Sequence, residues 1–338
     1  MRMKRTKILR YLLKKSFELF FVLIITFQLI SCKKDDSPII PEVPVTSWNL
    51  QNSNITNNLK SVFFTNEFTG YAAGNSFPND SNKIIKTTDG GETWHRKLSV
   101  DSVSISSIYF IDAFTGYAAC SRGKILKTVN GGDSWSALTT PYTDIYFDIT
   151  FFDQLKGVAT GNNGMIIATS NGGASWQSTY GTSLISYSSV SISSPTEVFV
   201  CGDQGKILYS SDYGNNWQVS LTPTASTLNS IYFTSSDTGY SCGVFGVILK
   251  TTNKGSNWVE LISPITEVFS SVYFINNETG FLTADYGSIY KTYDGGVSFT
   301  KVLTDSENYL TRMFFINNNS GWVVGSYGEI LHTTTGGN

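Results

Sequence analysis

Short runs of alternating apolar and polar residues fill most of the chain, and the same alternation returns every 41 residues. One isoleucine recurs in every copy while its neighbour two places later varies, which predicts a strand with a fixed inner side and a variable outer side. The fixed positions are Ile84, Ile125, Ile166, Ile207, Ile248, Ile289 and Ile330, and the variable ones are Lys86, Lys127, Ala168, Tyr209, Lys250, Lys291 and His332. An aromatic run such as 107–110 and a small-residue run such as 116–119 precede this strand. Four short strands per copy are typical of a propeller blade.

A glycine-rich string follows this strand in each copy and ends in an aromatic residue. Residues 87–94 read Thr-Thr-Asp-Gly-Gly-Glu-Thr-Trp, and the string recurs without any change of spacing. An Asp or Asn accepts hydrogen bonds from amides of its own turn, and glycine supplies a positive φ, so each string predicts a hairpin turn. The turn residues are Asp89, Asn130, Asn171, Asp212, Asn253 and Asp294, and the aromatic residues are Trp94, Trp135, Trp176, Trp217, Trp258 and Phe299.

The two ends of the repeat region set the number of blades. The seventh string stops at Asn338, before its Ser-Trp pair, while Ser47 and Trp48 stand alone ahead of the first copy. We expect Trp48 to complete the last turn and the N-terminal strand to close the last blade, so that no open sheet edge remains. The prediction is an all-β, seven-bladed β-propeller with four strands per blade over residues 46–338.

The strings resemble the Asp-box, or BNR, repeat of sialidases, sortilin-type receptors and several β-propellers, with the pattern Ser/Thr-x-Asp-x-Gly-x-Ser/Thr-Trp. The 41-residue spacing and the Gly-Tyr-x-x-Gly lead-in are most similar to the propellers of the photosystem II assembly/stability factor type. The resemblance covers residues 46–338 and implies a role in helping another protein to fold or assemble. Phe299, Val198 and Thr335 depart from the repeat pattern.

The first 31 residues have the layout of a secretion signal, with seven Lys and Arg residues ahead of an apolar stretch over 17–30. A small residue directly before Cys32, with Leu29 at the third position before it, resembles the bacterial lipobox, which implies cleavage and lipidation at Cys32. A transmembrane anchor is the alternative, but the clean apolar run has only about a dozen residues where spanning needs about 20.

Residues 32–45 contain three prolines and predict an extended tether between membrane and domain. The charged run 33–36 resembles an export signal for the outer surface of Gram-negative bacteria. We therefore expect a lipid anchor in the bacterial outer membrane, with the domain either surface-exposed or periplasmic and the lipid on Cys32 as the only membrane contact.

Charge and composition narrow the possible functions. The formal net charge of −2 divides into +6 over residues 1–31 and −8 over the remainder, so no nucleic-acid partner is expected. Only Arg96, Arg122 and Arg312 follow residue 31, and their places in the repeat do not let three guanidinium groups converge as in a sialidase-like site. No two carboxylates are placed as a two-carboxylate glycosidase requires, since Asp203 and Asp285 lie two blades apart. We expect no catalytic activity.

Metal, cofactor and disulfide chemistry are not expected either. His95 and His332 occupy unrelated positions of the repeat and do not form a metal site. Cys201 and Cys242 occupy one column of adjacent blades, too far apart for a disulfide, so we expect them and Cys120 to be buried free thiols. The chain is predicted to be a monomer without cofactor or metal.

One column of the repeat, at the start of the inner strand, carries the candidate binding residues. It reads Ser61, Ser107, Asp148, Ser189, Ser230, Ser271 and Arg312, so a hydroxyl ring at the channel mouth contains one acid and one base. The adjoining column includes Tyr146, Tyr187 and Phe269, which we expect to form an aromatic rim together with Phe147 and Tyr309. This rim belongs to the face of the inter-blade connections, opposite the Asp-boxes, and predicts the binding of a peptide segment or a sugar.

These observations predict a non-catalytic cell-envelope lipoprotein that acts as a protein-binding or assembly platform for an envelope protein through one face of the propeller. The alternative is a carbohydrate-binding or glycan-degrading surface lipoprotein, which requires the rings of Tyr146, Tyr187 and Phe269 to be exposed to solvent. A structural spacer or adhesin is a third possibility and would have no distinctive face.

Overall fold

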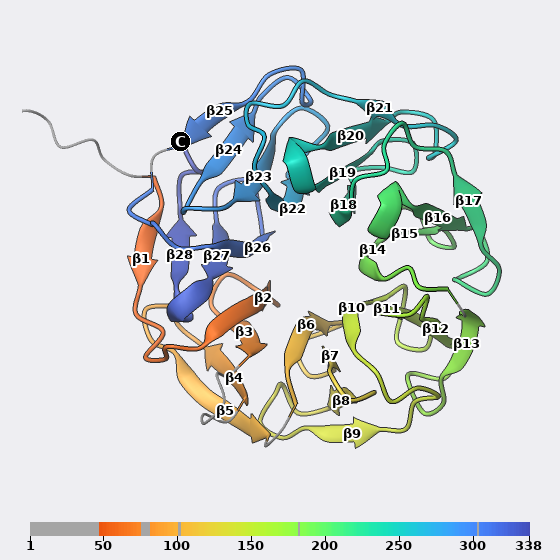
Figure 1. Cartoon of the computed structure of the whole chain (residues 1–338). Coiled ribbons are helices and arrows are strands. Elements are labelled where there is room, and N and C mark those ends of the chain that lie inside the picture. Colours follow the sequence, from red (N-terminus) through yellow and green to blue (C-terminus); the bar gives the residue numbers. More distant parts are fainter. Residues whose placement is uncertain (1–46, 76–81, 101–102, 182, 303) are drawn as a thin grey trace, which may run out of the picture. The chain divides into compact units, whose positions relative to one another are not determined.

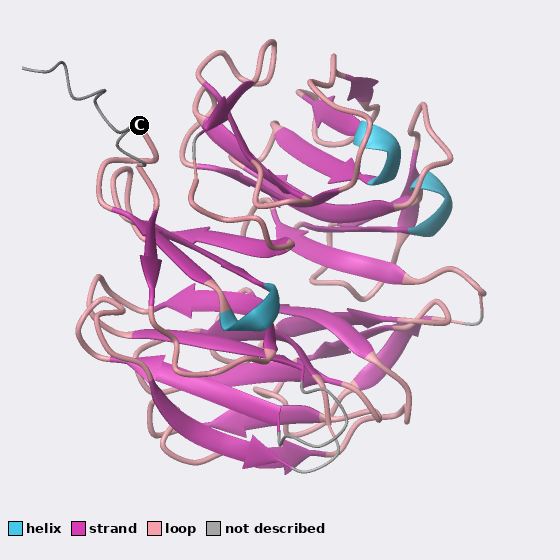
Figure 2. Cartoon of the chain, turned by 60° about the vertical axis from the view of Figure 1, so that its left-hand side comes forward, coloured by secondary structure: helices cyan, strands magenta, loops and turns pink. Residues whose placement is uncertain are grey.

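The computed structural model describes residues 47–75, 82–100, 103–181, 183–302 and 304–338. The predicted signal peptide 1–31, the lipidation site Cys32 and the tether 32–45 lie outside these ranges and stay predictions. The described part forms seven four-stranded antiparallel sheets in a ring, and one edge strand of each sheet faces the centre (Figure 1). Strands make up nearly all of its regular structure (Figure 2), and none of its helices is long and apolar enough to cross a membrane. The predicted all-β, seven-bladed propeller is confirmed.

Blades 1 to 6 follow the order of the chain, from inner to outer strand. Blade 1 contains β2 (Asn58–Phe64), β3 (Gly70–Asn75), β4 (Asn82–Thr87) and β5 (His95–Val100). Blade 2 contains β6 (Ile105–Phe110), β7 (Gly116–Cys120), β8 (Ile125–Thr128) and β9 (Ser136–Leu138). Blade 3 contains β10 (Tyr146–Phe151), β11 (Gly157–Gly161), β12 (Ile166–Thr169) and β13 (Gln177–Tyr180).

The second half of the ring repeats this pattern. Blade 4 contains β14 (Tyr187–Ile192), β15 (Val198–Gly202), β16 (Ile207–Ser210) and β17 (Gln218–Ser220). Blade 5 contains β18 (Leu228–Phe233), β19 (Gly239–Gly243), β20 (Ile248–Thr251) and β21 (Val259–Glu260), and blade 6 contains β22 (Phe269–Phe274), β23 (Gly280–Ala284), β24 (Ile289–Thr292) and β25 (Thr300–Val302). Blade 7 contains β26 (Leu310–Phe315), β27 (Gly321–Gly325), β28 (Ile330–Thr333) and β1 (Asn49–Gln51). Single helical turns join the second and third strands of blades 4, 5 and 7: η1 (Asp203–Gly205), η2 (Val244–Gly246) and η3 (Ser326–Gly328).

The N-terminal strand closes the ring as predicted. β1 pairs antiparallel with β28, with Leu50 opposite Leu331, and so forms the outer strand of the last blade. Trp48, just ahead of β1, is fully buried and meets the rings of Phe281 and Phe315 edge to face, at centroid distances of 6.2 and 5.8 Å. The tryptophan that the incomplete seventh string lacks is thus supplied from the other end of the domain.

The Asp-box is a hydrogen-bonded turn in which the acid serves its own backbone. In blade 1 the Asp89 carboxylate accepts the Thr93 amide at 2.9 Å and the Thr87 hydroxyl at 2.7 Å, and Thr87 Oγ1 accepts the Gly91 amide at 2.9 Å. Hydrogen bonds from Thr93 and Thr87 lower the pKa of Asp89 to about 2. Asn130 accepts the equivalent amide at 2.9 Å, so the turn needs the oxygen and not the charge.

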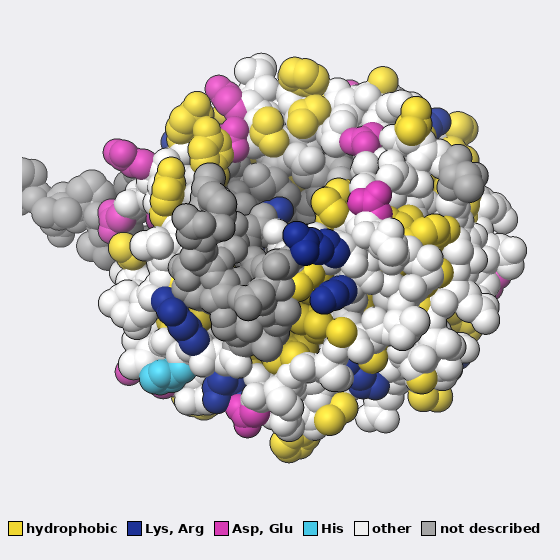
Figure 3. Space-filling view, turned by 60° about the horizontal axis from the view of Figure 1, so that its bottom comes forward, with side chains coloured by type: hydrophobic (Ala, Val, Ile, Leu, Met, Phe, Trp, Pro, Cys, Tyr) yellow, Lys and Arg dark blue, Asp and Glu magenta, His cyan; other side chains and the backbone are white. Residues whose placement is uncertain are grey.

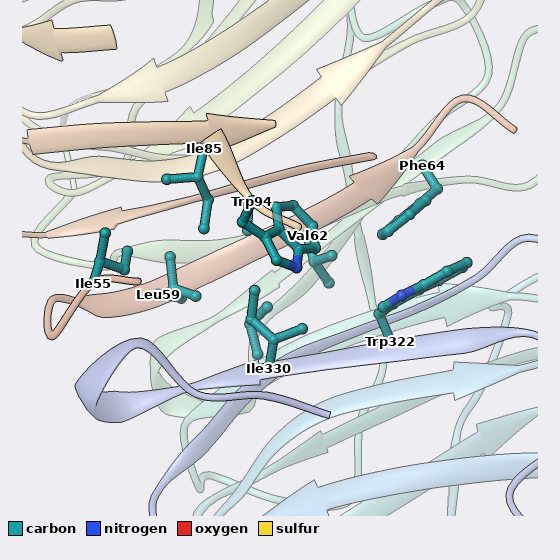
Figure 4. Packing of buried hydrophobic residues seen from close by; sticks show 10 residues of the cluster. Ile55, Leu59, Val62, Phe64, Ile85, Trp94, Trp322 and Ile330 are labelled. Carbon is teal, nitrogen blue, oxygen red and sulfur yellow. The ribbon is translucent and has the colours of Figure 1, made fainter. Parts of the chain in front are cut away.

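The hydrophobic core lies between the blades. All seven repeated isoleucines are fully buried, and each contributes about 2 kcal/mol relative to an exposed side chain. Figure 4 shows the cluster between blades 7 and 1, where Phe64 of β2 stacks on Trp322 of β27 at a centroid distance of 3.5 Å. Trp94 of the first Asp-box meets Phe64 edge to face at 6.0 Å. The Asp-box tryptophan therefore fastens its turn to the inner strand of its own blade.

The departure at Val198 has a compensating change opposite it. In the other six blades a glycine at this position faces a phenylalanine, and a Cβ atom at Gly239 would lie only 2.7 Å from the Phe233 ring. In blade 4 the phenylalanine is replaced by Ile192, which pairs directly with Val198. The smaller side chain leaves the room that valine needs, so blade 4 keeps the fold with an exchanged pair.

The column of Lys86 was predicted to face outward, and this prediction is wrong. Residues two apart share one side of a strand, so Lys86 lies on the side of Ile84, toward the next blade. Its Nζ donates to the Gly131 carbonyl of the next Asp-box at 2.7 Å, beside the Tyr71 hydroxyl that donates to the same oxygen at 2.8 Å. Lys127, Lys250 and Lys291 donate to the corresponding glycine carbonyls at 2.7–2.8 Å. These lysines join neighbouring blades.

The three cysteines behave as predicted. Cys120, Cys201 and Cys242 are buried free thiols, and burial raises the pKa of Cys201 to about 12. They fill space between the blades as small apolar side chains.

His332 takes the place of the lysine in blade 7 and makes the closing blade sensitive to acid. Its ring stacks on Trp322 at 4.5 Å, its Nε2 lies 3.2 Å from Ser320 Oγ, and burial lowers its pKa to about 4. The folded state disfavours the protonated ring, so this contribution to stability is complete above the unfolded-state pKa of about 6.5 and falls as the pH drops toward 4. We expect the free energy of unfolding to decline over this window in the parent chain more steeply than in His332→Phe, measured by urea titration at each pH. Parallel pH profiles for the two proteins would contradict this assignment.

Candidate functional site

The propeller has two faces with different turns. One, called the connection face below, carries the inter-blade connections and the turns between the second and third strands, as predicted. The other, the Asp-box face, carries the Asp-boxes and the turns between the first and second strands. Exposed apolar side chains on the Asp-box face include Phe68 and Phe114, which occupy equivalent turns of blades 1 and 2.

The expected aromatic rim of Tyr146, Tyr187 and Phe269 is wrong. All three side chains are buried, with exposed fractions of 0 to 1%. In every blade a β-bulge follows this position, for example between Tyr146 and Asp148. The bulge adds one residue and shifts the alternation of the strand, so Tyr146 points between the blades while the half-buried Phe147 takes the extra position.

Asp148 and Arg312 form an ion pair across the channel. Asp148 lies on β10 and Arg312 on β26, and Arg312 Nη2 approaches the two carboxylate oxygens at 3.1 and 3.2 Å. Asp148 is 1% exposed and the Arg312 side chain is 32% exposed. Asp148 and Arg312, which replace serine in this column, therefore balance each other's charge.

The Asp148 carboxylate holds four blades together. It accepts the Ser107 hydroxyl of blade 2 at 2.7 Å and the Ser189 hydroxyl and Val190 amide of blade 4 at 3.1 Å each, in addition to Arg312 of blade 7. Its own neighbour Ile149 donates a further amide at 3.0 Å. With this many donors the carboxylate is a structural clamp, because none of its oxygens is left to act on a ligand.

The serines of the same column are inter-blade contacts as well. Ser61 Oγ accepts the amide of Ile108 in the next blade at 3.1 Å, and Ser230 Oγ accepts that of Val272 at 3.2 Å. The hydroxyl ring is therefore part of the scaffold and was not recognised as such from the sequence.

Beyond this ring, toward the Asp-box face, the channel opens into a cavity of about 420 Å³. Five of the aromatic rings that line it form an arc, each two residues after the serine column: Phe63, Tyr109, Tyr232, Tyr273 and Phe314. Thr150 and Ser191 take the same place in blades 3 and 4, and Phe151 and Phe152 of blade 3 also line the cavity.

Four exposed aromatic side chains gather on the connection face over blades 5 to 7. Phe245, Tyr286 and Tyr327 are 77, 67 and 70% exposed, and Tyr309 of the predicted rim is 50% exposed. The rings of Tyr286 and Tyr309 lie 5.8 Å apart, and Tyr286, Asp285 and Tyr327 raise the pKa of Tyr309. We call Phe245, Tyr286, Tyr309 and Tyr327 the aromatic patch.

Three of these residues hold an unfavourable backbone conformation. Phe245, Tyr286 and Tyr327 have φ of 56 to 58°, a left-handed region that bulky residues rarely adopt and that costs about 1–3 kcal/mol. The equivalent residue of blade 3 is Asn163, which this region tolerates far better. Arg122 and Gln204 adopt the same conformation at the equivalent positions of blades 2 and 4, so the conformation belongs to this turn, and in blades 5 to 7 it carries exposed aromatic side chains.

The sequence carries a signal for this patch. Phe245, Tyr286 and Tyr327 occupy one 41-residue column, and each directly precedes a glycine. The column also contains Arg122, Asn163 and Gln204, so it varies where the scaffold columns are constant.

The described residues contain no cluster of three or more His, Cys, Asp or Glu side chains that could hold a metal ion. The three arginines of the domain come from different parts of their blades. Arg96 lies on the outer strand β5, Arg122 in a turn of the connection face and Arg312 on the inner strand β26.

Comparisons with known proteins agree with the fold. A family model described as photosynthesis system II assembly factor YCF48 matches residues 178–252 and 250–338. No curated protein matches the sequence.

Solved structures show the same architecture. One titled "YCF48 bound to D1 peptide" is 20% identical with a TM-score of 0.72, covering 87% of this chain and 97% of its own. YCF48 from Cyanidioschyzon merolae is 17% identical with a TM-score of 0.71, covering 86 and 99%. A GH74 xyloglucanase from Xanthomonas campestris is 13% identical with a TM-score of 0.68, and the match covers 86% of this chain but 54% of the enzyme. The chain is thus a seven-bladed Asp-box β-propeller that resembles the photosystem II assembly factor family.

Proposed function

We propose that the chain is a non-catalytic, lipid-anchored protein of the bacterial envelope that binds another protein through the connection face of its propeller. The aromatic patch is the observation that carries this proposal. Aromatic side chains are enriched at protein interfaces, and an exposed group of them on one face is typical of a binding site. The resemblance to an assembly factor, one relative of which is seen with a peptide bound, supports a protein partner.

The chemistry of the site favours binding over catalysis. Asp148, at the channel mouth, is engaged by five donors, and the Asp-box acids serve their own turns. Asp203 and Asp285 lie in turns two blades apart, which does not fit a pair of carboxylates acting on one bond.

The glycan alternative loses its original support because Tyr146, Tyr187 and Phe269 are buried. The xyloglucanase shares the fold with this chain at only 13% identity, and one fold hosts many unrelated functions. Glycans remain the next ligands to test if no protein is found.

The test is cross-linking in cells followed by affinity purification of the tagged chain. We expect one protein to be recovered with the parent chain and to be lost with the variant Phe245→Asn, Tyr286→Asn, Tyr327→Asn. Asparagine suits the left-handed turns, so this variant keeps the fold. Phe68→Ser with Phe114→Ser removes two exposed aromatic residues from the opposite face and is the matched control.

Equal recovery with the patch variant, or no recovered protein at all, would refute the proposal. Cys32→Ser tests the anchor separately: it should release the chain from the membrane fraction while the isolated partner still binds to it.

A further inference from the structure

Charge is divided unevenly over the connection face. The segments of this face that lead into or lie within blades 5 to 7 are 221–227, 244–247, 261–268, 285–288, 304–309 and 326–329. They contain five carboxylates and no Lys or Arg: Glu267, Asp285, Asp305, Glu307 and Glu329. The corresponding turn of blade 2 carries Arg122 and Lys124. In Figure 3 Lys and Arg side chains are visible near the centre of the view and in its lower half.

The acids lie beside the aromatic patch. Asp285 directly precedes Tyr286, and the Glu267 carbonyl accepts the amide of Gly246, which follows Phe245. Burial raises the pKa of Asp285, and the neighbouring Glu267 adds to the rise. A carboxylate whose charge is disfavoured by burial and by a neighbouring acid, as that of Asp285 is, would be stabilised by a cation beside it.

The rest of the molecule shows how this chain uses tyrosine rings and cations together. On the Asp-box side, Lys127 Nζ lies 5.2 Å from the centre of the Tyr117 ring, and Lys156 Nζ lies 3.6 Å from that of Tyr213. The aromatic patch has rings and carboxylates but no cation of its own among the described residues of its segments. A Lys or Arg side chain can form a cation–π contact with a ring face and a charge-assisted hydrogen bond with a carboxylate, so the patch and its acids suit a Lys or Arg side chain of a partner.

From this juxtaposition we infer that the partner presents a basic segment, rich in Lys or Arg, to the aromatic patch and to the carboxylates of Glu267 and Asp285. This inference rests on the proposed function and adds the chemistry of the partner. An acidic partner would be repelled by the same carboxylates.

The test uses two short synthetic peptides, one of alternating arginine and glycine and one with glutamate in place of arginine. Binding to the purified chain is measured by fluorescence anisotropy. We expect only the arginine peptide to bind, and its Kd to rise about tenfold in Glu267→Gln, Asp285→Asn and about tenfold in Phe245→Asn, Tyr286→Asn, Tyr327→Asn. The Phe68→Ser, Phe114→Ser control should bind as the parent does, and added salt should weaken binding.

Binding of both peptides alike, absence of binding, or unchanged affinity in the two patch variants would overturn the inference. Self-association, measured by sedimentation and abolished by Arg122→Ser, would also overturn it, because the occupant would then be a second copy. The two proposals fail separately. If the Glu267→Gln, Asp285→Asn chain still recovers the partner from cells and the aromatic variant does not, protein binding through the connection face is supported, and a basic binding segment of the partner is excluded.

Discussion

Replacing Asp148 with alanine is expected to lower the free energy of unfolding by about 3–5 kcal/mol. The substitution leaves the hydroxyls of Ser107 and Ser189 and the amide of Val190 without their acceptor inside the channel wall. It also leaves the Arg312 guanidinium without its counter-ion. Chemical denaturation of the two proteins, followed by tryptophan fluorescence, measures the difference.

Arg312→Ala provides the comparison that identifies the clamp. Asp148 keeps four other donors when the guanidinium is removed, and Arg312 is partly exposed, so we expect a loss of only about 1 kcal/mol. Asp148→Ser restores the residue found in five of the other blades and should fall between the two. Equal losses of unfolding free energy for Asp148→Ala and Arg312→Ala would mean that the ion pair, and not the inter-blade hydrogen bonds, accounts for the stabilisation.

Trp48→Ala is expected to cost about 3–5 kcal/mol, because it removes a fully buried side chain from the junction of blades 6 and 7. The loss also releases β1, which is held by only three residue pairs to β28. We expect limited proteolysis to cut the variant near residues 49–57 while the parent chain resists.

Leu50→Ala is the control for Trp48→Ala, since Leu50 lies on β1 but is 65% exposed. Its stability should stay within about 0.5 kcal/mol of the parent. Comparable destabilisation by both substitutions would show that β1 pairing, and not the tryptophan anchor, closes the ring.

The sequence predicts the fold well because each part of it is local and repeated. The Asp-box turn, the buried isoleucine and the isolated Trp48 each follow from a short string, and the 41-residue period multiplies every signal by seven. The number of blades could therefore be counted, and the closure of the ring by the N-terminal strand could be predicted.

The side-chain directions at the channel could not be predicted, because a bulge is not visible in the pattern. Alternation carried from Asp148 back to Tyr146 places both on one side, whereas the bulge between them turns Tyr146 into the core. The pairing of Asp148 with Arg312 joins residues 164 positions apart and depends on the width of the ring. The lysine contacts between blades could not be predicted either, because the partner of Lys86 is a backbone carbonyl oxygen, which leaves no signal in the sequence.

The entry of the chain through β1 has a mechanical consequence. Tension applied to the segment ahead of Ser47 reaches β1, the strand that closes the ring, through Trp48, and among the described strands only β28 pairs with β1. Trp48 stands between that segment and the pairing, so a pull must draw an indole out of the core before the three residue pairs bear load. We therefore expect the propeller to open under force between β1 and β28, after the Trp48 side chain has left the core.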